Sequence, residues 1–280
     1  MDDFQESLVS EYSSRALDQR TQWYSPTAEA YQRVRPRYPG AIINQVVDLA
    51  HLSPQSRILE VGCGPAIATL PFAALGCSMV CVEPNPDFYG LAQQTCQGYP
   101  NVNLENCSFE EWNLEAQPSP KKFDAVLAAT SFHWVDPAIG YAKAAAALKP
   151  EGFLIFLWNA ELQPSHELYQ QLDTVYQRHQ PYLNRSYKDP DTQLSELASL
   201  GDMMVQSGLF QTPVTGHAIV DALYSVDQYL QLLTTYSPFL KLEPQRREQV
   251  LEELRQVLPQ DNDFKLPLSF VSAFQVAQLR

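Results

Sequence analysis

Basic side chains are scarce in this sequence of 280 residues. It has 19 lysines and arginines against 32 aspartates and glutamates, and its formal net charge is −13. A protein that grips DNA or RNA needs stripes of basic side chains that displace counterions from the phosphates. The charge balance therefore argues against a nucleic acid or an anionic membrane surface as the partner, and we expect a small-molecule substrate.

Long apolar runs and metal-binding spacings are missing too. No run approaches the ~20 apolar residues of a membrane helix, and the acidic start M-D-D-F-Q-E lacks the apolar core of a signal peptide. None of the five cysteines forms a C-x-x-C pair, and the five histidines are scattered without ligand spacing. We therefore expect no bound metal, reduced buried thiols, and a cytoplasmic protein that is a monomer or a homodimer.

What the sequence does contain is a strand–turn–strand pattern in residues 57–83. An apolar run stops at Gly62 and Gly64, and a helical pattern follows; a second apolar run, residues 77–82, ends at Glu83. Glycines after a buried strand let backbone N–H groups approach a ligand closely. An acid at the end of the next strand can accept hydrogen bonds from both hydroxyls of a ribose. The pattern predicts a site for a cofactor that contains ribose.

This stretch resembles motif I, and the acid that follows it, of class I S-adenosylmethionine-dependent methyltransferases. The resemblance implies that Glu60 is the motif I acid and that Gly62 and Gly64 line the methionine end of the cofactor. It also implies that Glu83 binds the ribose. In this family the loop after the third strand borders the adenine, and Ser108 and Phe109 are the candidates by position. With Thr130 and Arg35, which are described below, the expected cofactor-binding residues are Glu60, Gly62, Cys63, Gly64, Glu83, Pro84, Ser108, Phe109, Thr130 and Arg35.

The glycine turn departs from the family pattern at one position. The family usually has G-x-G-x-G, and here Ala66 stands at the third glycine, where its methyl group narrows the turn. The alternative is a dinucleotide-binding turn, G-x-G-x-x-G, which would need glycine at Ile67. Later segments also fit the methyltransferase, so we favour S-adenosylmethionine as the cofactor and keep a nicotinamide cofactor as the alternative.

Apolar segments recur along the chain with helical patterns between them. The expected strands begin at Ile58 and then cover residues 77–82, 101–107, 123–129, 153–158, 209–220 and 266–277. The alternation predicts an α/β fold. With the resemblance, we expect a single domain of residues 1–280 built on a Rossmann-like seven-stranded methyltransferase sheet. This sheet is expected to be mostly parallel, with an antiparallel last strand and helices on both faces. Residues 161–210 are expected to form a helical cap insertion over the substrate pocket.

Residues 1–39 are expected to form an N-terminal lid or strap. The stretch from Trp23 to Pro39 is rich in aromatic residues, prolines and arginines. Its R-P-x-Y-P segment, which begins at Arg35, matches a stretch that many small-molecule methyltransferases carry. Arg33 or Arg35 could then meet a carboxylate of the cofactor or the substrate. The simpler interpretation is a connecting segment with solvated arginines.

The fourth expected strand ends in T-S-F-H-W, residues 130–134. Ligands lie at the carboxyl ends of strands in open α/β sheets, so we expect Thr130, Phe132, His133 and Trp134 near the transferred methyl group. His133 is the candidate catalytic residue, as a general base for a hydroxyl acceptor. A carboxylate acceptor needs no base, and a hydrogen-bonding wall residue is the simpler role. The expected walls of the substrate pocket are Trp23, Tyr24, Trp134, Trp158 and Tyr236, with core packing as the simpler interpretation of each tryptophan.

The predicted function is methyl transfer from S-adenosylmethionine to a small-molecule acceptor, by O-methylation of a carboxylate or a hydroxyl. Trans-aconitate methyltransferases are the type that the whole chain resembles, by R-P-x-Y-P, by F-H-W at the strand end and by T-x-S at Thr235 and Ser237. Two alternatives stay open. One is an NAD-dependent oxidoreductase, and the other is a regulator that binds S-adenosylmethionine without turnover.

Overall fold

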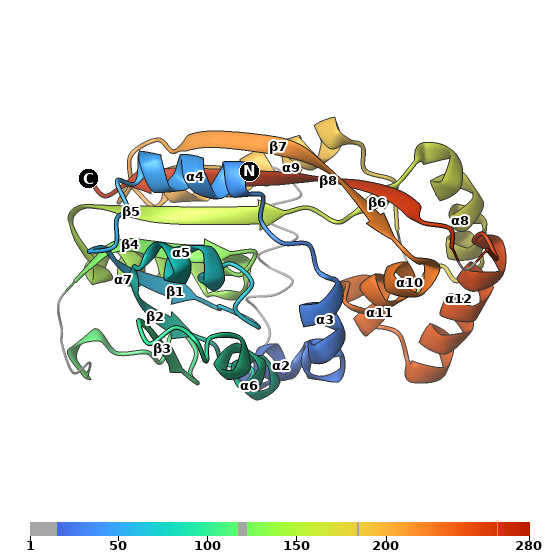
Figure 1. Ribbon diagram of the computed structural model, residues 1–280, viewed down its shortest axis with the longest axis horizontal. Coiled ribbons are helices and arrows are strands. Elements are labelled where there is room, and N and C mark those ends of the chain that lie inside the picture. The colour runs from blue at the N-terminus through green and yellow to red at the C-terminus, as the bar shows by residue number, and fades with distance from the viewer. Residues whose placement is uncertain (1–15, 117–121, 184, 262) are drawn as a thin grey trace.

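One sheet organises the protein (Figure 1). The computed structural model describes residues 16–116, 122–183, 185–261 and 263–280, so the first fifteen residues of the expected lid lie outside the described part. Within it, eight strands follow the order β3-β2-β1-β4-β5-β8-β6, with β7 paired to β8. The strands are β1 (Arg57–Val61), β2 (Ser78–Val82), β3 (Val102–Glu105), β4 (Phe123–Ala129), β5 (Leu148–Asn159), β6 (Gln163–Pro164), β7 (Val214–Tyr224) and β8 (Leu266–Gln278).

The sheet is parallel in one half and antiparallel in the other. β1 pairs in parallel with β2 and β4, β2 with β3, and β4 with β5, so these strands end at the same edge. β8 runs antiparallel to β5, β6 and β7. This confirms the expected Rossmann-like sheet with an antiparallel last strand. The short β6 adds one strand to the expected seven.

The sixth expected strand begins later than residues 209–220 predict. β7 covers Val214–Tyr224, and Phe210 makes only an isolated bridge with Leu279. Pro213 explains the late start, because it has no N–H to donate to a ladder and is therefore found at the beginnings and edges of strands.

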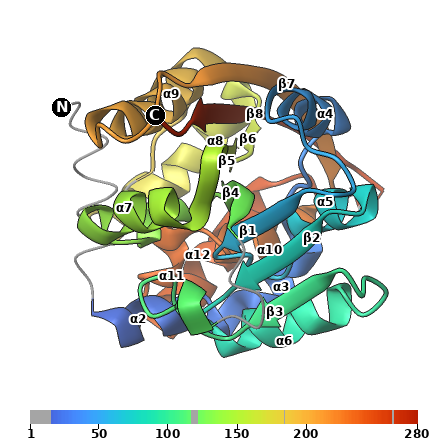
Figure 2. The same ribbon diagram turned by 90° about the vertical axis from the view of Figure 1, so that its left-hand side faces the viewer.

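Helices cover both faces of the sheet (Figure 2). α4 and α5 pack on one face around Ile42 and Phe72, and α7 and α9 pack on the other around Tyr141 and Met204. The helices are α2 (Leu17–Gln22), α3 (Ala28–Val34), α4 (Gly40–Leu49), α5 (Thr69–Leu75), α6 (Pro86–Thr95), α7 (Pro137–Ala147), α8 (His166–Arg178), α9 (Pro190–Gln206), α10 (Val226–Thr234), α11 (Ser237–Leu240) and α12 (Pro244–Val257). No helix in the described ranges is long and apolar enough to cross a membrane.

A third apolar core lies at the right-hand end of the molecule in Figure 1. It joins α8, α10, α11 and α12 to the first residues of β8, around Leu172, Leu233, Phe239 and Leu254. α8 packs against α12, whereas α9 packs against β8. The two helices of the expected cap therefore belong to different parts of the molecule.

Candidate active site

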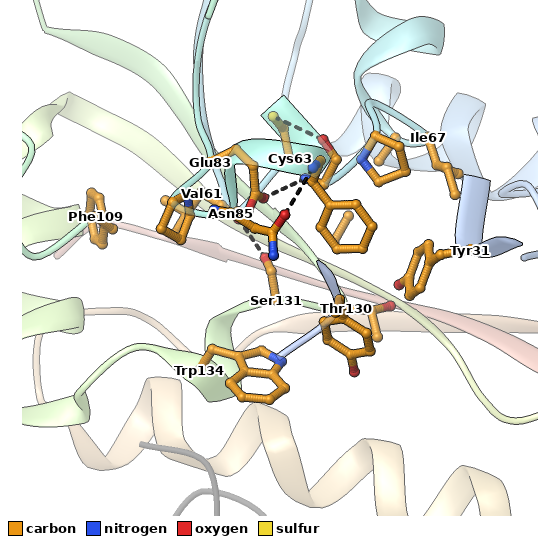
Figure 3. A pocket seen from close by; sticks show the side chains of 18 of the residues that line it. Tyr31, Val61, Cys63, Ile67, Glu83, Asn85, Phe109, Thr130, Ser131 and Trp134 are labelled. Atoms are coloured by element: carbon orange, nitrogen blue, oxygen red, sulfur yellow. Dashed lines mark hydrogen bonds between the residues drawn. The ribbon is translucent and has the colours of Figure 1, made fainter. Parts of the chain in front are cut away.

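A pocket lies at the carboxyl ends of the parallel strands (Figure 3). The strand ends contribute residues 61–64, 83–85, 108–110 and 129–131, together with Asn159, the last residue of β5. Open α/β sheets bind ligands at this edge because successive strand ends meet there. Further lining residues come from α2, α3 and the segment that follows α3.

The expected cap does not cover this pocket. No described residue of 161–210 lines it, because α8 is committed to the third core and α9 to the surface of β8. The N-terminal segment between Leu17 and Tyr38 lines it instead. Trp134 accepts a hydrogen bond from Arg20 at its backbone carbonyl, and the Arg20 Nη1 also lies 2.9 Å from Glu110 Oε1. This half-buried ion pair ties α2 to the loop that follows β3.

The glycine loop after β1 approaches β4 closely. The N–H groups of Gly62 and Cys63 both donate to the carbonyl of Val82 at the end of β2. Gly62 has φ +65°, and a Cβ there would lie 2.8 Å from the Cβ of Ser131. Ser131 in turn donates its hydroxyl to the carbonyl of Val61. Only glycine fits this position, both in backbone conformation and in space.

Two residues that are not glycine share the left-handed conformation at this site. Ala66, at the third position of the glycine turn, has φ +68° and is fully buried, and Thr130 at the end of β4 has φ +53°. The left-handed region costs an L-residue about 1–2 kcal/mol. Such strain concentrates at ligand sites, where the surrounding structure holds it in place. The turn therefore keeps the backbone shape of the glycine pattern even where alanine replaces glycine.

Glu83 lines the pocket and accepts hydrogen bonds from two backbone N–H groups. Its Oε2 accepts from the N–H of Gly64 at 2.7 Å, and its Oε1 accepts from the N–H of Asn85 at 2.9 Å. An ionised carboxylate offers about four acceptor positions, so each oxygen keeps one for a ligand. Burial raises the pKa of Glu83 to about 7. The Asn85 side chain caps α6 by accepting from the N–H groups of Asp87 and Phe88, which fixes this strand end.

Glu60 lies behind the glycine loop and does not line the pocket. Its Oε2 accepts from the hydroxyl of Thr69 at 2.7 Å and from the thiol of Cys81. Burial raises its pKa to about 7, and the charge of Glu83 adds to this. Strand side chains alternate between faces, so Glu60 points toward α5. Its contacts tie β1 to that helix.

The loop after β3 forms another part of the wall. The Ser108 hydroxyl donates to Glu111 Oε2 at 2.9 Å and accepts from the Glu111 N–H at 3.1 Å, so this side chain is engaged within its own loop. Phe109 is buried against Trp112 and Phe132. Both Ser108 and Phe109 line the pocket as well. Phe109 therefore combines a core position with a pocket position.

Arg35 brings a buried positive charge to the pocket. Its Nε and Nη2 donate to the hydroxyl and the carbonyl of Thr235, at 2.8 and 2.6 Å. Its guanidinium lies 4.7 Å from the ring centroid of Tyr31 and 4.3 Å from that of Tyr236. No described carboxylate forms an ion pair with Arg35, and burial opposes its charge while the neighbouring tyrosines and Glu161 favour it, with the pKa raised on balance. An anionic ligand group would supply the missing partner.

Three polar side chains join the N-terminal segment to the ends of β4 and β5. The hydroxyls of Tyr38 and Thr130 are 2.9 Å apart, and Asn159 Nδ2 donates to the carbonyl of Pro36 at 3.2 Å. Asn159 Oδ1 is buried and has no hydrogen-bond partner among the described residues. It is an acceptor that a ligand donor could satisfy.

His133 is not where the sequence predicts it. It lies with Trp158 in a smaller apolar hollow on the α7 side of the sheet and does not line the main pocket. Residues 132–134 form a 3₁₀ turn, in which successive side chains point about 120° apart. Trp134 therefore faces the pocket while His133 faces Trp158. Burial lowers the pKa of His133 to about 4, so its imidazole is a weak base.

The aromatic residues expected to line the substrate pocket also divide, because some line it and others lie outside it. Tyr24 and Trp134 line the pocket, with their ring centroids 5.7 Å apart. Trp23 packs behind them, 6.2 Å from Trp134. Trp158 donates its Nε1 to Gln275 Oε1 at 3.0 Å on the other side of the sheet. Tyr236 accepts from the N–H of Leu162 at 3.0 Å and supports Arg35 from behind, outside the pocket lining.

Most of the expected site residues nevertheless meet at one pocket. Those that line it are Arg35, Gly62, Cys63, Gly64, Glu83, Pro84, Ser108, Phe109 and Thr130, with Tyr24 and Trp134. Sequence reasoning missed Tyr31, Tyr38, Asn85, Ser131 and Asn159. Tyr38 belongs to R-P-x-Y-P, and Asn159 follows the fifth apolar run, so both had a usable signal. Tyr31 and Ser131 had none, because their place depends on how α3 and β4 meet the glycine loop.

Comparison with known protein families matches the segment that supplies most of the strand ends at this pocket. Residues 59–154 match the model of a family described as a methyltransferase domain. The segment runs from β1 to β5 and contains the glycine loop, Glu83 and Thr130.

Curated relatives agree with this match. An uncharacterized methyltransferase of Mycobacterium tuberculosis is 32% identical over 130 residues, which are 46% of this chain and 49% of that protein. A thiol S-methyltransferase of Rattus norvegicus is 26% identical over 139 residues, 49% of this chain and 56% of that protein. The chain spans about half the length of the curated relatives it matches.

Solved structures share the fold over most of the chain. A proposed type II methyltransferase from Anaeromyxobacter dehalogenans superposes with a TM-score of 0.62 and 19% identity, covering 87% of this chain and 97% of that one. Phosphoethanolamine N-methyltransferase 2 of Haemonchus contortus, solved with S-adenosyl-L-methionine, gives a TM-score of 0.50 and 16% identity over 99% of this chain and 60% of that one. The fold is that of the Rossmann-like methyltransferases, and residues 59–154 within it are similar to a methyltransferase domain.

Proposed function

We propose that the protein is an S-adenosylmethionine-dependent methyltransferase that acts on a small-molecule acceptor. The observation that carries the proposal is the position of Glu83. Its carboxylate fastens the glycine loop through the N–H of Gly64 and still has acceptor positions at the pocket. Two ribose hydroxyls fit these positions, as the family resemblance implies.

The other parts of the pocket fit the rest of this cofactor. Gly62 and Gly64 expose backbone beside Glu83, and Phe109 offers an apolar surface to an adenine ring. At the far end, the cation of Arg35 suits an amino-acid carboxylate, and the unpartnered Oδ1 of Asn159 suits an ammonium group. A nucleoside attached to an amino acid uses all of these groups at once.

When bound, S-adenosylmethionine supplies an electrophilic methyl group on a sulfonium. The protein's part is to orient the acceptor in line with it, which contributes roughly 7–11 kcal/mol in favourable cases. Tyr24, Tyr31 and Trp134 line the pocket, and their rings tolerate a cation while they exclude water.

The acceptor is best explained as a carboxylate. A hydroxyl must lose its proton during transfer, but the described lining residues include no histidine or lysine to take it. The two lining carboxylates are engaged otherwise, because Glu83 binds the glycine loop and Glu110 forms an ion pair with Arg20. Burial raises the pKa of Tyr38 above its usual range, so this phenol stays protonated. A carboxylate is already ionised at neutral pH and needs no base. Carboxylate O-methylation is also what the resemblance to trans-aconitate methyltransferases implies.

A nicotinamide cofactor fits this pocket less well. A pyrophosphate needs free N–H groups of the glycine loop at the start of a helix. Here the N–H of Gly64 is committed to Glu83, and α5 begins only at Thr69. A carboxylate at that N–H repels a pyrophosphate but accepts hydroxyls.

A transfer assay with methyl-labelled S-adenosylmethionine and panels of carboxylic acids, alcohols and thiols tests the proposal. We expect label in products from the carboxylic acids, and alkali should release it as methanol because methyl esters hydrolyse. Label that survives alkali would show that the acceptor is a hydroxyl or a thiol. Cofactor binding without transfer to any panel would favour the non-catalytic regulator.

The matched variants are Glu83→Ala, which removes the ribose acceptor, and Glu105→Ala, which removes an acid at the end of β3 outside the pocket lining. We expect the first to abolish most transfer at low cofactor concentration and the second to leave it unchanged.

A further inference from the structure

β7 lies at the outer margin of the sheet in both views of the molecule (Figures 1 and 2). It pairs with β8 along its whole length, from Val214 opposite Val276 to Tyr224 opposite Leu266. The strand order gives it no other partner among the described strands. Within the described part of the chain, one edge of β7 is therefore open over eleven residues. Open strand edges are templates for pairing with another chain.

The contacts of Val271 show which backbone groups of β7 face this open edge. Val271 stands opposite Ile219, yet its N–H donates to Gln193 and its carbonyl accepts from Ala160, both on the side of β8 away from β7. Ile219 and Val271 are thus a non-hydrogen-bonded pair of the antiparallel ladder. The N–H and carbonyl of Ile219 point outward, and so do those of every second residue of the strand.

The same alternate residues expose their side chains. Thr215, His217, Ile219, Asp221 and Leu223 are exposed, whereas the residues between them are half-buried. Ile219 is 57% exposed and Leu223 is 70% exposed. Sheet edges that avoid association carry prolines, lysines or bulges. β7 has none of these and presents isoleucine at its centre instead.

We propose that β7 pairs antiparallel with β7 of a second copy of this chain, around a two-fold axis at Ile219. In this register Ile219 faces the partner's Ile219, and His217 faces the partner's Asp221. Symmetry repeats the His217–Asp221 pair on the other side of the axis, and it brings Thr215 opposite the partner's Leu223. All of these are outward-facing residues, so each opposed pair can exchange backbone hydrogen bonds.

The self-complementary pattern is what selects a second copy as the occupant. A two-fold interface must place each residue opposite a compatible one from the same strand. In β7 the apolar Ile219 lies on the axis, and the polar side chains of His217 and Asp221 lie two positions to either side of it. Cross-strand pairs of unlike charge stabilise an antiparallel ladder, and like charges destabilise it.

Cysteine cross-linking tests this register directly. In Ile219→Cys the two thiols would meet at the axis, where opposed Cα atoms lie about 5.5 Å apart, within the range that a disulfide spans. In Leu223→Cys, at a more exposed site, the two thiols would lie roughly 27 Å apart, because each is four residues from the axis. Mild oxidation should link the first variant into dimers and leave the second monomeric on denaturing gels.

The native cysteines set the baseline for that experiment. Four of them are buried and Cys107 is half-buried, so wild-type protein should give few linked dimers. Equal cross-linking of the two variants, or none in either, would overturn the proposed register.

Light scattering coupled to gel filtration tests the association itself. Wild type should elute as a dimer at micromolar concentration. Ile219→Lys should weaken association about tenfold or more, and Ile139→Lys, an exposed isoleucine on α7, should not weaken it. A wild-type monomer, or a dimer that Ile219→Lys leaves intact, would refute the proposal.

A charge exchange separates the His217–Asp221 pair from general damage to the strand. His217→Glu places like charges opposite one another, and Asp221→Lys removes the carboxylate that His217 faces, so each should weaken the dimer several-fold. The double variant places opposite charges in every pair and should recover association. If the double variant is weaker than either single variant, His217 and Asp221 do not face each other.

Discussion

The buried carboxylate of Glu83 should make cofactor binding depend on pH. Two hydroxyl donors require the ionised form, and burial raises the pKa of Glu83 to about 7. About a tenth of the side chain is therefore ionised at pH 6 and about nine tenths at pH 8. Cofactor binding should favour the ionised form of Glu83. The affinity for the cofactor should therefore rise about tenfold from pH 6 to pH 8, and binding should release protons below pH 7.

Isothermal titration with S-adenosylhomocysteine at pH 6, 7 and 8 measures this effect, and two buffers of different ionisation enthalpy report the protons. Glu83→Gln should bind weakly and lose most of the pH dependence. Glu60→Gln is the matched control, because Glu60 also has its pKa raised to about 7 but lies behind the loop, outside the lining. A wild-type affinity that stays flat between pH 6 and 8, or an equal slope in Glu83→Gln, would refute the reasoning.

Four further substitutions probe the pocket and its surroundings. A left-handed backbone costs an L-residue about 1–2 kcal/mol. Gly62→Ala should lower the free energy of unfolding in urea by more than this, because the new methyl group would also clash with Ser131. Gly64→Ala should lower it by the backbone cost alone, because its methyl group would meet nothing within 4 Å. Arg35→Gln should weaken cofactor binding by about 1.5–3 kcal/mol in calorimetry, and unchanged affinity would remove the cofactor carboxylate as its partner. His133→Gln should keep the transfer rate within a few-fold, whereas loss of a general base would cost about 10²–10⁴-fold.

The sequence predicted the strands that carry the pocket because their signals are local. The apolar runs of β1, β2 and β4 end at glycine or polar residues in the sequence. In the structure the three strands end at the same places, at the edge of the sheet. Glu83 and the glycine loop are separated by one βαβ unit, so their meeting follows from the parallel pairing of β1 with β2.

The errors arose where side-chain direction depends on tertiary structure. His133 and Trp134 are neighbours in sequence, but a single 3₁₀ turn directs Trp134 into the pocket and His133 into the hollow on the α7 side of the sheet. Residues 161–210 have the helical periodicity of a cap, but periodicity does not say which surface a helix covers. α8 packs against α12, which lies more than 60 residues later in the chain.

The central claim is that the pocket between Gly62 and Glu83 binds S-adenosylmethionine. Calorimetric titration of the wild type with S-adenosylmethionine and with NAD, repeated with Glu83→Ala, tests it most directly. The account predicts binding of S-adenosylmethionine alone and a loss of about 1.5–3 kcal/mol in the variant, the scale of hydrogen bonds to a charged group. Binding of NAD without S-adenosylmethionine, or an affinity that Glu83→Ala leaves unchanged, would contradict it.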